Sequence, residues 1–212
     1  MEKVDFKKRD KALYQPKKEP VLLSVPKLSF LMVDGEGDPN EAGGAYQEAV
    51  GILYALSYTV KMSKNSAWRP EGYFEYVVAP LEGLWTQKGR QGMDYAHKEL
   101  LQWTAMIRQP EFVTEAVFEQ AALEVQRKKG LDTVKARLVS WEEGLCVQCL
   151  HVGSYDDEPY TVERLHDFIR DQGLLLDMDD QSRRHHELYL SDPRKIAPDK
   201  LKTLLRLPVK RP

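Results

Sequence analysis

A glutamate stands at the centre of the segment RHHELYLSDP, residues 184–193, in surroundings that favour chemistry. Leu188 and Leu190 share one parity along this segment, whereas Glu187 and Tyr189 share the other. Alternation with a period of two is typical of a strand with two unlike faces, so we expect the leucines to pack against helices. The opposite face then presents a carboxylate beside a phenol ring. Such a carboxylate can accept a proton from water or balance the charge of a cationic ligand.

A second carboxylate lies in the segment HVGSYDDEPYT, residues 151–161. His151 and Tyr155 share a strand parity, so both are candidates to face a ligand. Glu158 has two interpretations, a residue of a ligand groove or an acid at the entry of a helix, and the residues leave both open.

The elements that must position these groups follow a repeated order. Each half of the chain is predicted to contain a hairpin, a helix and two strands, and a helix at 114–129 joins the halves. The predicted hairpins are 21–33, with its turn at Pro26-Lys27, and 134–152, with its turn around 142–144. The other predicted elements are a helix beginning at Asp38-Pro39, strands at 73–79, 81–85 and 101–108, a helix at 161–172, a strand through 185–190 and a strand at 201–209.

Aromatic residues of both halves are expected to meet in one space. Aligning Pro80 with Pro193 shifts one half by about 113 residues, which places Phe74 and Tyr76 at the positions of Glu187 and Tyr189. Aromatic side chains offer flat apolar surface to a ring system. The predicted ligand-binding residues are Phe74, Tyr76, Trp85, Trp103 and Met106 from the first half, and His151, Tyr155 and Tyr189 from the second.

The sequence thus predicts an α+β fold of tandem duplicated strand-helix-strand-strand modules with pseudo-two-fold symmetry. Helices would cover one face of a curved antiparallel sheet, and the other face would form a ligand groove where the halves meet. Residues 1–20 are interpreted as a charged N-terminal arm and residues 21–212 as a single domain. Its halves, at about 21–112 and 134–210, flank the linking helix at 114–129.

Composition excludes several classes of function. The 212 residues carry a net charge of −2, so no broad positive field is available to hold nucleic acid. No apolar run approaches the roughly 20 residues that a membrane helix needs, and no signal peptide is expected, which makes the cytoplasm the expected compartment. The pair Cys146 and Cys149 lies in a strand-like segment, so we expect buried side chains rather than a redox or metal site. Adjacent His185 and His186 point apart on a strand, which argues against a shared metal ion.

Seven segments, in order along the chain, together carry a family resemblance. They are LYQPKKEP at 13–20, FLMVDGEGDPN at 30–40, YVVAPLEGLW at 76–85, WTAMIRQPEFVTE at 103–115, EGLCVQCLHVGSYDDEP at 143–159, HHELYLSDPRK at 185–195 and LKTLLRLPVK at 201–210. Over essentially its whole length the chain resembles the GyrI-like small-molecule-binding proteins in their stand-alone form.

The resemblance implies both a fold and a chemistry. It implies tandem strand-helix-strand-strand modules around a ligand groove, in which Glu187 matches a buried glutamate that meets cationic aromatic drugs in related regulators. The most similar branch includes cyclopropanoid cyclopropyl hydrolases, which open the strained cyclopropane of DNA-alkylating natural products by adding water. Glu158 and Glu187 match the positions assigned to water activation there. Tyr155, Tyr189 and His151 are candidates to donate a hydrogen bond to the substrate carbonyl.

Two hypotheses therefore stand beside each other. The first is a hydrolase that detoxifies flat aromatic compounds, with Glu187 and Glu158 activating water and with no metal or organic cofactor. The second is a binding module in which the same groove sequesters aromatic or cationic compounds and Glu187 acts as counter-ion. A gyrase-protecting protein that binds another protein is a third and weaker idea. A homodimer is compatible with the small net charge and is neither required nor excluded.

Overall fold

The computed structural model describes residues 3–89, 94, 96–179 and 183–212. The strands are β1 (Val21–Glu36), β2 (Leu81–Gln87), β3 (Leu101–Arg108), β4 (Ala136–Val152), β5 (Leu175–Leu176), β6 (His185–Tyr189) and β7 (Lys202–Lys210). The α-helices are α1 (Phe6–Arg9), α2 (Lys11–Tyr14), α3 (Ala45–Met62), α4 (Glu115–Lys129) and α5 (Glu158–Asp171). Short 3-10 helices are η1 (Ser63–Asn65), η2 (Lys98–Leu100), η3 (Tyr155–Asp157) and η4 (Pro198–Lys200).

The sheet closes into a barrel. Its strand order is β4-β1-β3-β2-β6-β7-β5, and β4 also pairs with β7, so six strands form a ring within the described part of the chain. Every pairing in this ring is antiparallel. The predicted α+β class is confirmed, but the sheet closes on itself instead of forming an open curved sheet with a groove. The internal duplication of modules stays a prediction.

The two predicted hairpins are wrong, because each is one long strand. β1 runs unbroken through Pro26, which lies between the paired residues Val25 and Lys27 and is itself left out of the β1–β4 register. Proline has no backbone N–H to donate, and a strand tolerates it where the ladder is interrupted. β4 likewise continues through Gly144, whose positive φ of 74° fits a local kink rather than a chain reversal. Long strands of this kind let β1 and β4 span the whole wall.

Two further predictions differ from the structure. Residues 73–79 form no strand; only Tyr76 bridges, in parallel, to Val4, and Val77 donates its backbone N–H to the Val4 carbonyl at 2.8 Å. The aromatic content that suggested a strand instead reflects burial. Helix α3 begins at Ala45 rather than at Asp38-Pro39, because the Asp38 side chain accepts the Asn40 N–H at 2.9 Å and closes a local turn.

The remaining elements agree with the sequence analysis. β3 has the predicted bounds, and β2, β6 and β7 lie where extended segments were expected. Helix α4 is capped by Thr114, whose hydroxyl accepts the Val117 N–H, and ends at Gly130 in the left-handed conformation. Cys146 and Cys149 are both free and buried, on opposite sides of β4 in separate core clusters.

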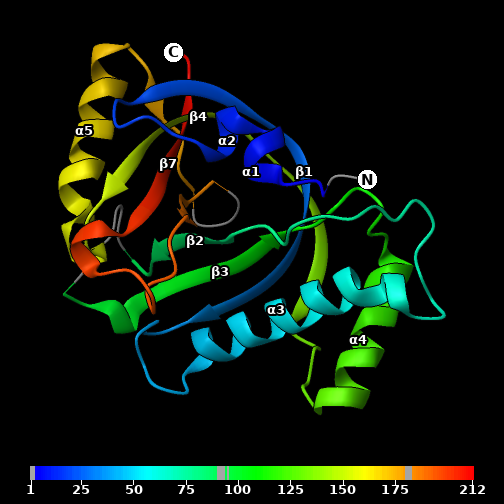
Figure 1. Ribbon diagram of the computed structural model, residues 1–212. Helices are drawn as coiled ribbons and strands as arrows, with labels where there is room; N and C mark the ends of the chain where they lie inside the picture. The colour runs from blue at the N-terminus through cyan, green and yellow to red at the C-terminus, as the bar shows by residue number, and fades with distance from the viewer. Residues whose placement is uncertain (1–2, 90–93, 95, 180–182) are drawn as a thin grey trace.

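Helices cover the outside of the barrel (Figure 1). α3 packs on β1 and β3, and α4 packs on α3, while α5 lies along β4 and β7. The core between α5 and the wall includes Val147, Leu165 and Leu205. In the described residues, no helix is long and apolar enough to cross a membrane.

The N-terminal segment, residues 3–14, closes one end of the barrel, as Figure 1 shows near the label α1. Phe6, Leu13 and Tyr14 are buried, although the lysines of this segment are largely exposed. Arg108 from the end of β3 lies over the Phe6 ring at 4.4 Å and forms an ion pair of 2.7 Å with Asp10. This segment is therefore part of the core rather than a fully solvated arm.

A charged network fills the barrel beneath this segment. Glu143 accepts hydrogen bonds from Arg206 at 2.6 Å and lies 2.9 Å from the His186 ring, whose other nitrogen lies 3.1 Å from Glu82. Tyr14 completes the network by donating to Glu82 at 3.1 Å. Burial alone would raise the pKa of Glu143, but Arg206 and His186 outweigh it and lower that pKa to about 2. The charges inside the barrel are therefore paired, as buried charges must be.

Candidate functional site

Strand β6 directs its residues to the two sides of the barrel wall. His186 and Leu188 face inward, where Leu188 joins the core and His186 joins the charged network. Glu187 and Tyr189 face outward with His185, toward the layer that contains α3 and α5. The predicted alternation is confirmed, and so is the divergence of the two histidines. The unusual face of this strand therefore lies under the helical layer, not in bulk solvent.

Glu187 is held by two neighbours on its own strand. The Tyr189 hydroxyl donates to Glu187 Oε2 at 2.8 Å, and His185 Nε2 lies 3.2 Å from Glu187 Oε1. The Trp85 indole in turn donates to the Tyr189 oxygen at 3.0 Å. Burial, reinforced by the Glu187 charge, raises the pKa of Tyr189 well above its ordinary value. Tyr189 thus remains a proton donor at neutral pH and fixes one carboxylate oxygen.

Glu158 is the second carboxyl group of the site and begins α5. Its side chain is 1% exposed, and its Oε1 has no hydrogen-bond partner. Burial, and next the nearby Glu187 carboxylate, raise the pKa of Glu158 well above its ordinary value. Two acids this close cannot both ionise at low cost, so Glu158 holds its proton to a higher pH than an ordinary glutamate does. Of the two interpretations left open by the sequence, burial beside Glu187 favours the site residue.

Aromatic rings form the wall beside the carboxyl groups. Trp85 on β2 and Trp103 on β3 are register partners, and Tyr46 from the first turn of α3 contacts both rings, with centroids at 5.3 Å and 5.0 Å. Glycines make room for the rings: a Cβ at Gly35 would lie within 3.0 Å of the Trp103 ring, and a Cβ at Gly83 would lie 2.6 Å from Trp85 Nε1. The rings are therefore closely packed against the barrel.

Tyr155 and His151 have different places. Tyr155, in η3 just before α5, meets the Tyr189 ring edge-on at 5.9 Å, and burial raises its pKa to about 12. His151 is committed on both ring nitrogens: Nε2 lies 2.9 Å from the Ser154 carbonyl, and Nδ1 lies 2.8 Å from the Thr161 hydroxyl. Because a carbonyl only accepts, Nε2 carries a proton, and His151 secures the turn that leads to Glu158.

Three predicted ligand-binding residues, Phe74, Tyr76 and Met106, lie away from the carboxyl groups and the aromatic rings beside them. Phe74 and Tyr76 pack with Phe112, at centroid distances of 5.2 Å and 5.9 Å, and no ring contact given for the described residues joins them to Trp85, Trp103 or Tyr189. Met106 faces the barrel interior, beside Phe30, Met32 and Leu84. The expected meeting of Phe74 and Tyr76 with Glu187 followed from the assumed duplication and hairpins. Closure of the sheet places the segment 73–79 elsewhere.

Two residues of the site were missed by sequence reasoning. For Tyr46, no sequence signal distinguishes a core tyrosine from one that contacts a site. His185 shares the strand parity of Glu187, so the alternation of this segment could have placed it on the same face as Glu187. It is 3% exposed and its Nε2 forms no hydrogen bond of good geometry.

The acidic cluster has the composition of a cation site. Glu158, His185 and Glu187 are all buried, and one donor atom of each lies within 4.8 Å of the others. Zinc and similar divalent ions accept carboxylate oxygen and imidazole nitrogen ligands. That the protein needs no metal stays a prediction, which removal of metal ions by a chelator can test.

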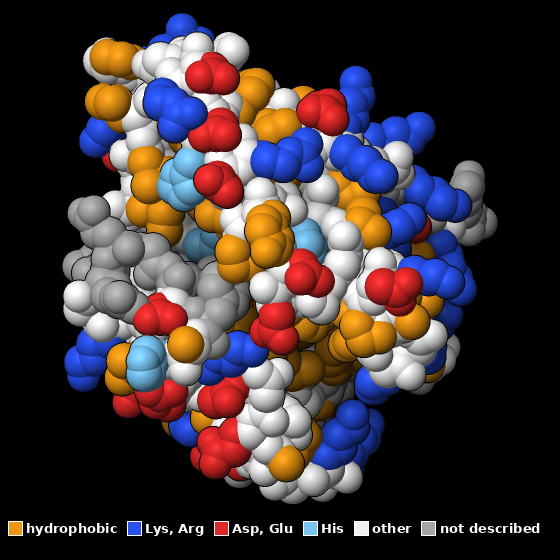
Figure 2. All heavy atoms as spheres, turned by 90° about the vertical axis from the view of Figure 1, so that its left-hand side faces the viewer, with side chains coloured by type: hydrophobic (Ala, Val, Ile, Leu, Met, Phe, Trp, Pro, Cys, Tyr) orange, Lys and Arg blue, Asp and Glu red, His pale blue; other side chains and the backbone are white. Residues whose placement is uncertain are grey.

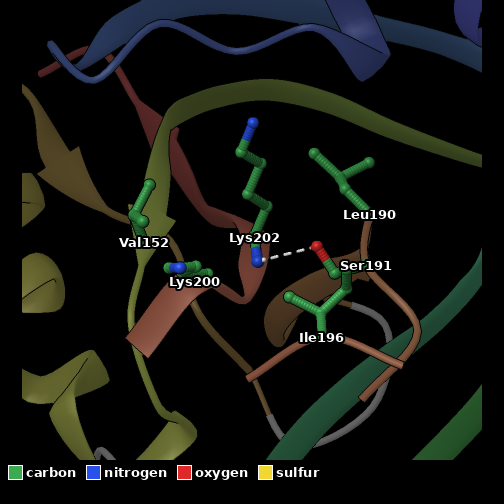
Figure 3. Close-up of a pocket in the computed structure, with 6 residues that line it drawn as sticks. All are labelled: Val152, Leu190, Ser191, Ile196, Lys200 and Lys202. Atoms are coloured by element: carbon green, nitrogen blue, oxygen red, sulfur yellow. Dashed lines mark hydrogen bonds between the residues drawn. The ribbon is translucent and has the colours of Figure 1, made fainter. Parts of the chain in front are cut away.

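A surface depression of about 570 Å³ lies beside this site but on the other side of the strands (Figure 3). It is lined by Val152, Leu190, Ser191, Ile196, Lys200 and Lys202. Val152 and Leu190 each follow a residue of the outward face, His151 and Tyr189, so alternation turns them to the barrel mouth. The carboxyl groups do not line it. Figure 2, which views the side of Figure 1 that carries α5, shows acidic and basic side chains interspersed, as the near-zero net charge suggests.

Comparisons with known proteins identify the family. Residues 18–210 match the model of the GyrI-like small molecule binding domain. Two solved structures of hydrolases from Listeria innocua are 46% and 47% identical to this chain, with TM-scores of 0.89 and 0.91. The alignments cover 98% and 99% of this chain and all of each hydrolase chain. An uncharacterized conserved protein from Listeria innocua is 48% identical, with a TM-score of 0.92, over 98% of this chain and all of that one.

More distant similarity concerns the fold alone. The C-terminal domain of EcmrR is 12% identical, with a TM-score of 0.54, over 92% of this chain and 98% of that domain. No curated protein matches significantly. With the family model covering most of the chain and closely similar structures at full length, the chain belongs to the GyrI-like small molecule binding domain family.

Proposed function

We propose that this protein is a hydrolase that adds water to the strained cyclopropane of flat, DNA-alkylating cyclopropanoid compounds and so detoxifies them. The observation that carries the proposal is the buried pair Glu158 and Glu187, in which the pKa of Glu158 is raised, beside the rings of Tyr46, Trp85 and Trp103. The similarity to hydrolases from Listeria innocua supports hydrolysis rather than another reaction class.

The raised pKa of Glu158 suits the two carboxyl groups to different roles. Glu187 accepts a proton from the attacking water through Oε1, because Tyr189 fixes Oε2 and Oε1 has only the longer 3.2 Å approach to His185. Glu158 retains its proton and orients the water or returns a proton to the product. Such positioned proton transfer contributes about 10²–10⁴-fold to a rate. Near-attack positioning of the water against the ring carbon adds to this factor.

The atoms balance without any further reactant. The water oxygen forms a bond to the cyclopropane carbon, and the ring carbon–carbon bond breaks. Its electron pair passes through the conjugated dienone to the carbonyl oxygen, which becomes a phenol after taking a proton. The product is the substrate plus one water. The aromatic walls hold the flat substrate in place.

The experiment is incubation with a duocarmycin-type cyclopropane compound, followed by mass spectrometry. We expect a gain of one water with the wild-type protein and a loss of at least 100-fold in rate for both Glu187→Gln and Glu158→Gln. Glu163→Gln, which changes an exposed glutamate on the same helix, is the matched control and should retain full activity. Undiminished hydrolysis by Glu187→Gln would contradict the proposed base.

A second candidate function is sequestration without chemistry. The family description as a small molecule binding domain favours it, and a buried Glu187 among aromatic rings suits a cationic aromatic ligand. The same experiment separates the two: saturable binding of an unchanged compound supports sequestration and contradicts the hydrolase.

A further inference from the structure

The proposed reaction delivers negative charge to the substrate carbonyl oxygen, and a hydrogen-bond donor must meet it there. Two of the three donors suggested by the sequence are already committed. The Tyr189 hydroxyl donates to Glu187 Oε2, and His151 Nε2 donates to the Ser154 carbonyl. His151 Nδ1 is also engaged, with Thr161. Neither residue has a free donor for a ligand.

Two other donors in the same ring cluster make no hydrogen bond of good geometry. They are the buried Tyr46 hydroxyl, which lies near the Tyr189 hydroxyl, and the buried Trp103 indole Nε1. Native structures leave few buried polar groups unpaired, since each costs free energy, so each one calls for an explanation. The Tyr189 hydroxyl lies within reach of the Tyr46 hydroxyl, but its proton is directed to Glu187 and one of its two acceptor positions is taken by Trp85, so it offers Tyr46 at most a weak contact.

The two unpaired donors belong to one packed unit. The rings of Tyr46 and Trp103 meet edge to face, 5.0 Å apart at 87°, and Tyr46 also contacts Trp85, which binds the Tyr189 that holds Glu187. Trp103 cannot withdraw, because its ring lies against the backbone of Gly35, where even a Cβ would clash. Its N–H is thus held in a fixed orientation, which is the preorganisation that stabilisation of a developing charge requires.

We propose that Tyr46 and Trp103 donate hydrogen bonds to a carbonyl oxygen of the ligand, and that this site selects flat ring systems that carry such an acceptor. The inference rests on the proposed function, since the same two donors stabilise the oxyanion formed when the cyclopropane bond breaks. Flat hydrocarbons, and cations without an acceptor oxygen, leave both donors unpaired and bind less well. This assigns to Tyr46 a ligand contact in place of a purely structural role.

A binding experiment tests the donors independently of catalysis. The probes are 9-fluorenone and fluorene, flat tricyclic compounds that differ in a single carbonyl group, and the signal is quenching of tryptophan fluorescence. We expect the wild-type protein to bind 9-fluorenone about tenfold more tightly, and Tyr46→Phe and Trp103→Phe each to reduce this preference toward unity. Tyr54→Phe, on the same helix, is the matched control and should keep the preference. Equal affinity of the wild-type protein for both probes would overturn the proposal.

Turnover and stability complete the test. On the duocarmycin-type compound we expect Tyr46→Phe to lower kcat by about 10²-fold, as removal of one oxyanion donor does elsewhere. Its melting temperature should be unchanged or higher, because the lost hydroxyl makes no hydrogen bond of good geometry in the protein; a marked decrease would show a structural role and contradict the assignment. A carbonyl preference that depends on Tyr46 but comes without hydrolysis would uphold the donors and refute the proposed hydrolase.

Discussion

Tyr189 donates a 2.8 Å hydrogen bond to Glu187, two residues earlier on the same strand. Residues at this spacing lie on one face of a strand, so the backbone itself brings the phenol to the carboxylate. The bond fixes one oxygen of Glu187, while the other approaches His185 at 3.2 Å. The orientation of the proposed base, Glu187, therefore depends on contacts within the five residues of β6.

Tyr189→Phe should weaken both the site and the fold. It removes the donor to Glu187 and the acceptor of the Trp85 indole, and hydrogen bonds to charged groups contribute about 1.5–3 kcal/mol. We expect a lower melting temperature and a rate of hydrolysis reduced by at least tenfold. Tyr160→Phe, at a position that is 73% exposed, is the control and should change neither quantity.

Glu158→Gln should alter the pH dependence of stability. The unfolded chain ionises Glu158 near the ordinary pKa of 4.5, whereas the folded protein holds the proton to higher pH. The unfolded state thus binds fewer protons above pH 4.5, and the free energy of unfolding falls as the pH rises, by up to about 1.4 kcal/mol per pH unit. Denaturant titrations between pH 5 and pH 8 should show that Glu158→Gln flattens this decline, while Glu163→Gln leaves it in place. An identical slope in Glu158→Gln would contradict the raised pKa.

Glu143→Gln should be strongly destabilising. It leaves Arg206 and His186 without their shared carboxylate inside the barrel, and breaking a buried ion pair costs about 3–5 kcal/mol. The neighbouring Glu142→Gln changes an exposed side chain and should cost less than about 0.5 kcal/mol. Because the pKa of Glu143 is lowered from 4.5 to about 2, its stabilising contribution should be complete above pH 4.5 and decrease as the pH falls toward 2. Urea unfolding of both variants is the measurement.

Gly35→Ala should disturb the aromatic wall. The added methyl would lie within 3.0 Å of the Trp103 ring, which is 2% exposed and cannot move freely. Overpacking of this kind costs about 1–3 kcal/mol, and the shifted indole should change its fluorescence and reduce ligand affinity. Gly51→Ala on α3 meets nothing within 4 Å and should stabilise the protein slightly. Unchanged fluorescence and affinity in Gly35→Ala would show that Trp103 is not held by this contact.

Removal of metal ions should leave the proposed activity intact. Dialysis of the protein against a chelator should not change the rate of water addition if Glu187 is the base. Loss of activity that zinc restores would instead indicate that Glu158, His185 and Glu187 act as ligands. Titration of the chelated protein with zinc, followed by equilibrium dialysis, gives a second readout that does not depend on turnover.

Local sequence signals predicted much of the fold. The bounds of α4, predicted at 114–129, and the alternation of β6 could be predicted because they depend on neighbours a few residues away, such as the capping residues Thr114 and Gly130. The same alternation correctly separated Glu187 from Leu188. Alternation singled out Glu187 as a candidate, whereas local pattern left Glu158 open between a groove residue and a helix-entry acid.

The rest depended on contacts that are distant in sequence. Pro26 and Gly144 are typical of turns, yet each lies within a long strand: Pro26 at a gap in the β1–β4 register, and Gly144 in the pair with Val25 next to that gap. The aromatic residues Phe74 and Tyr76 suggested a strand facing the ligand, whereas pairing with Val4 and burial against Phe112 place them in the core. Tyr46 joins the site only because α3 crosses β3, and no local pattern encodes that crossing.

Because the six strands close into a barrel, its wall has an inner side and an outer side that carry different groups of residues. The inner side holds the charges and apolar side chains that keep the strands in register, and the outer side carries Glu187 and the rings around it. Substitutions of outer-side residues around Glu187 therefore leave the charged network inside the barrel untouched. The residues that contact a ligand and the residues that pair the buried charges thus lie on opposite sides of the same strands, so ligand preference and the interior network can vary separately.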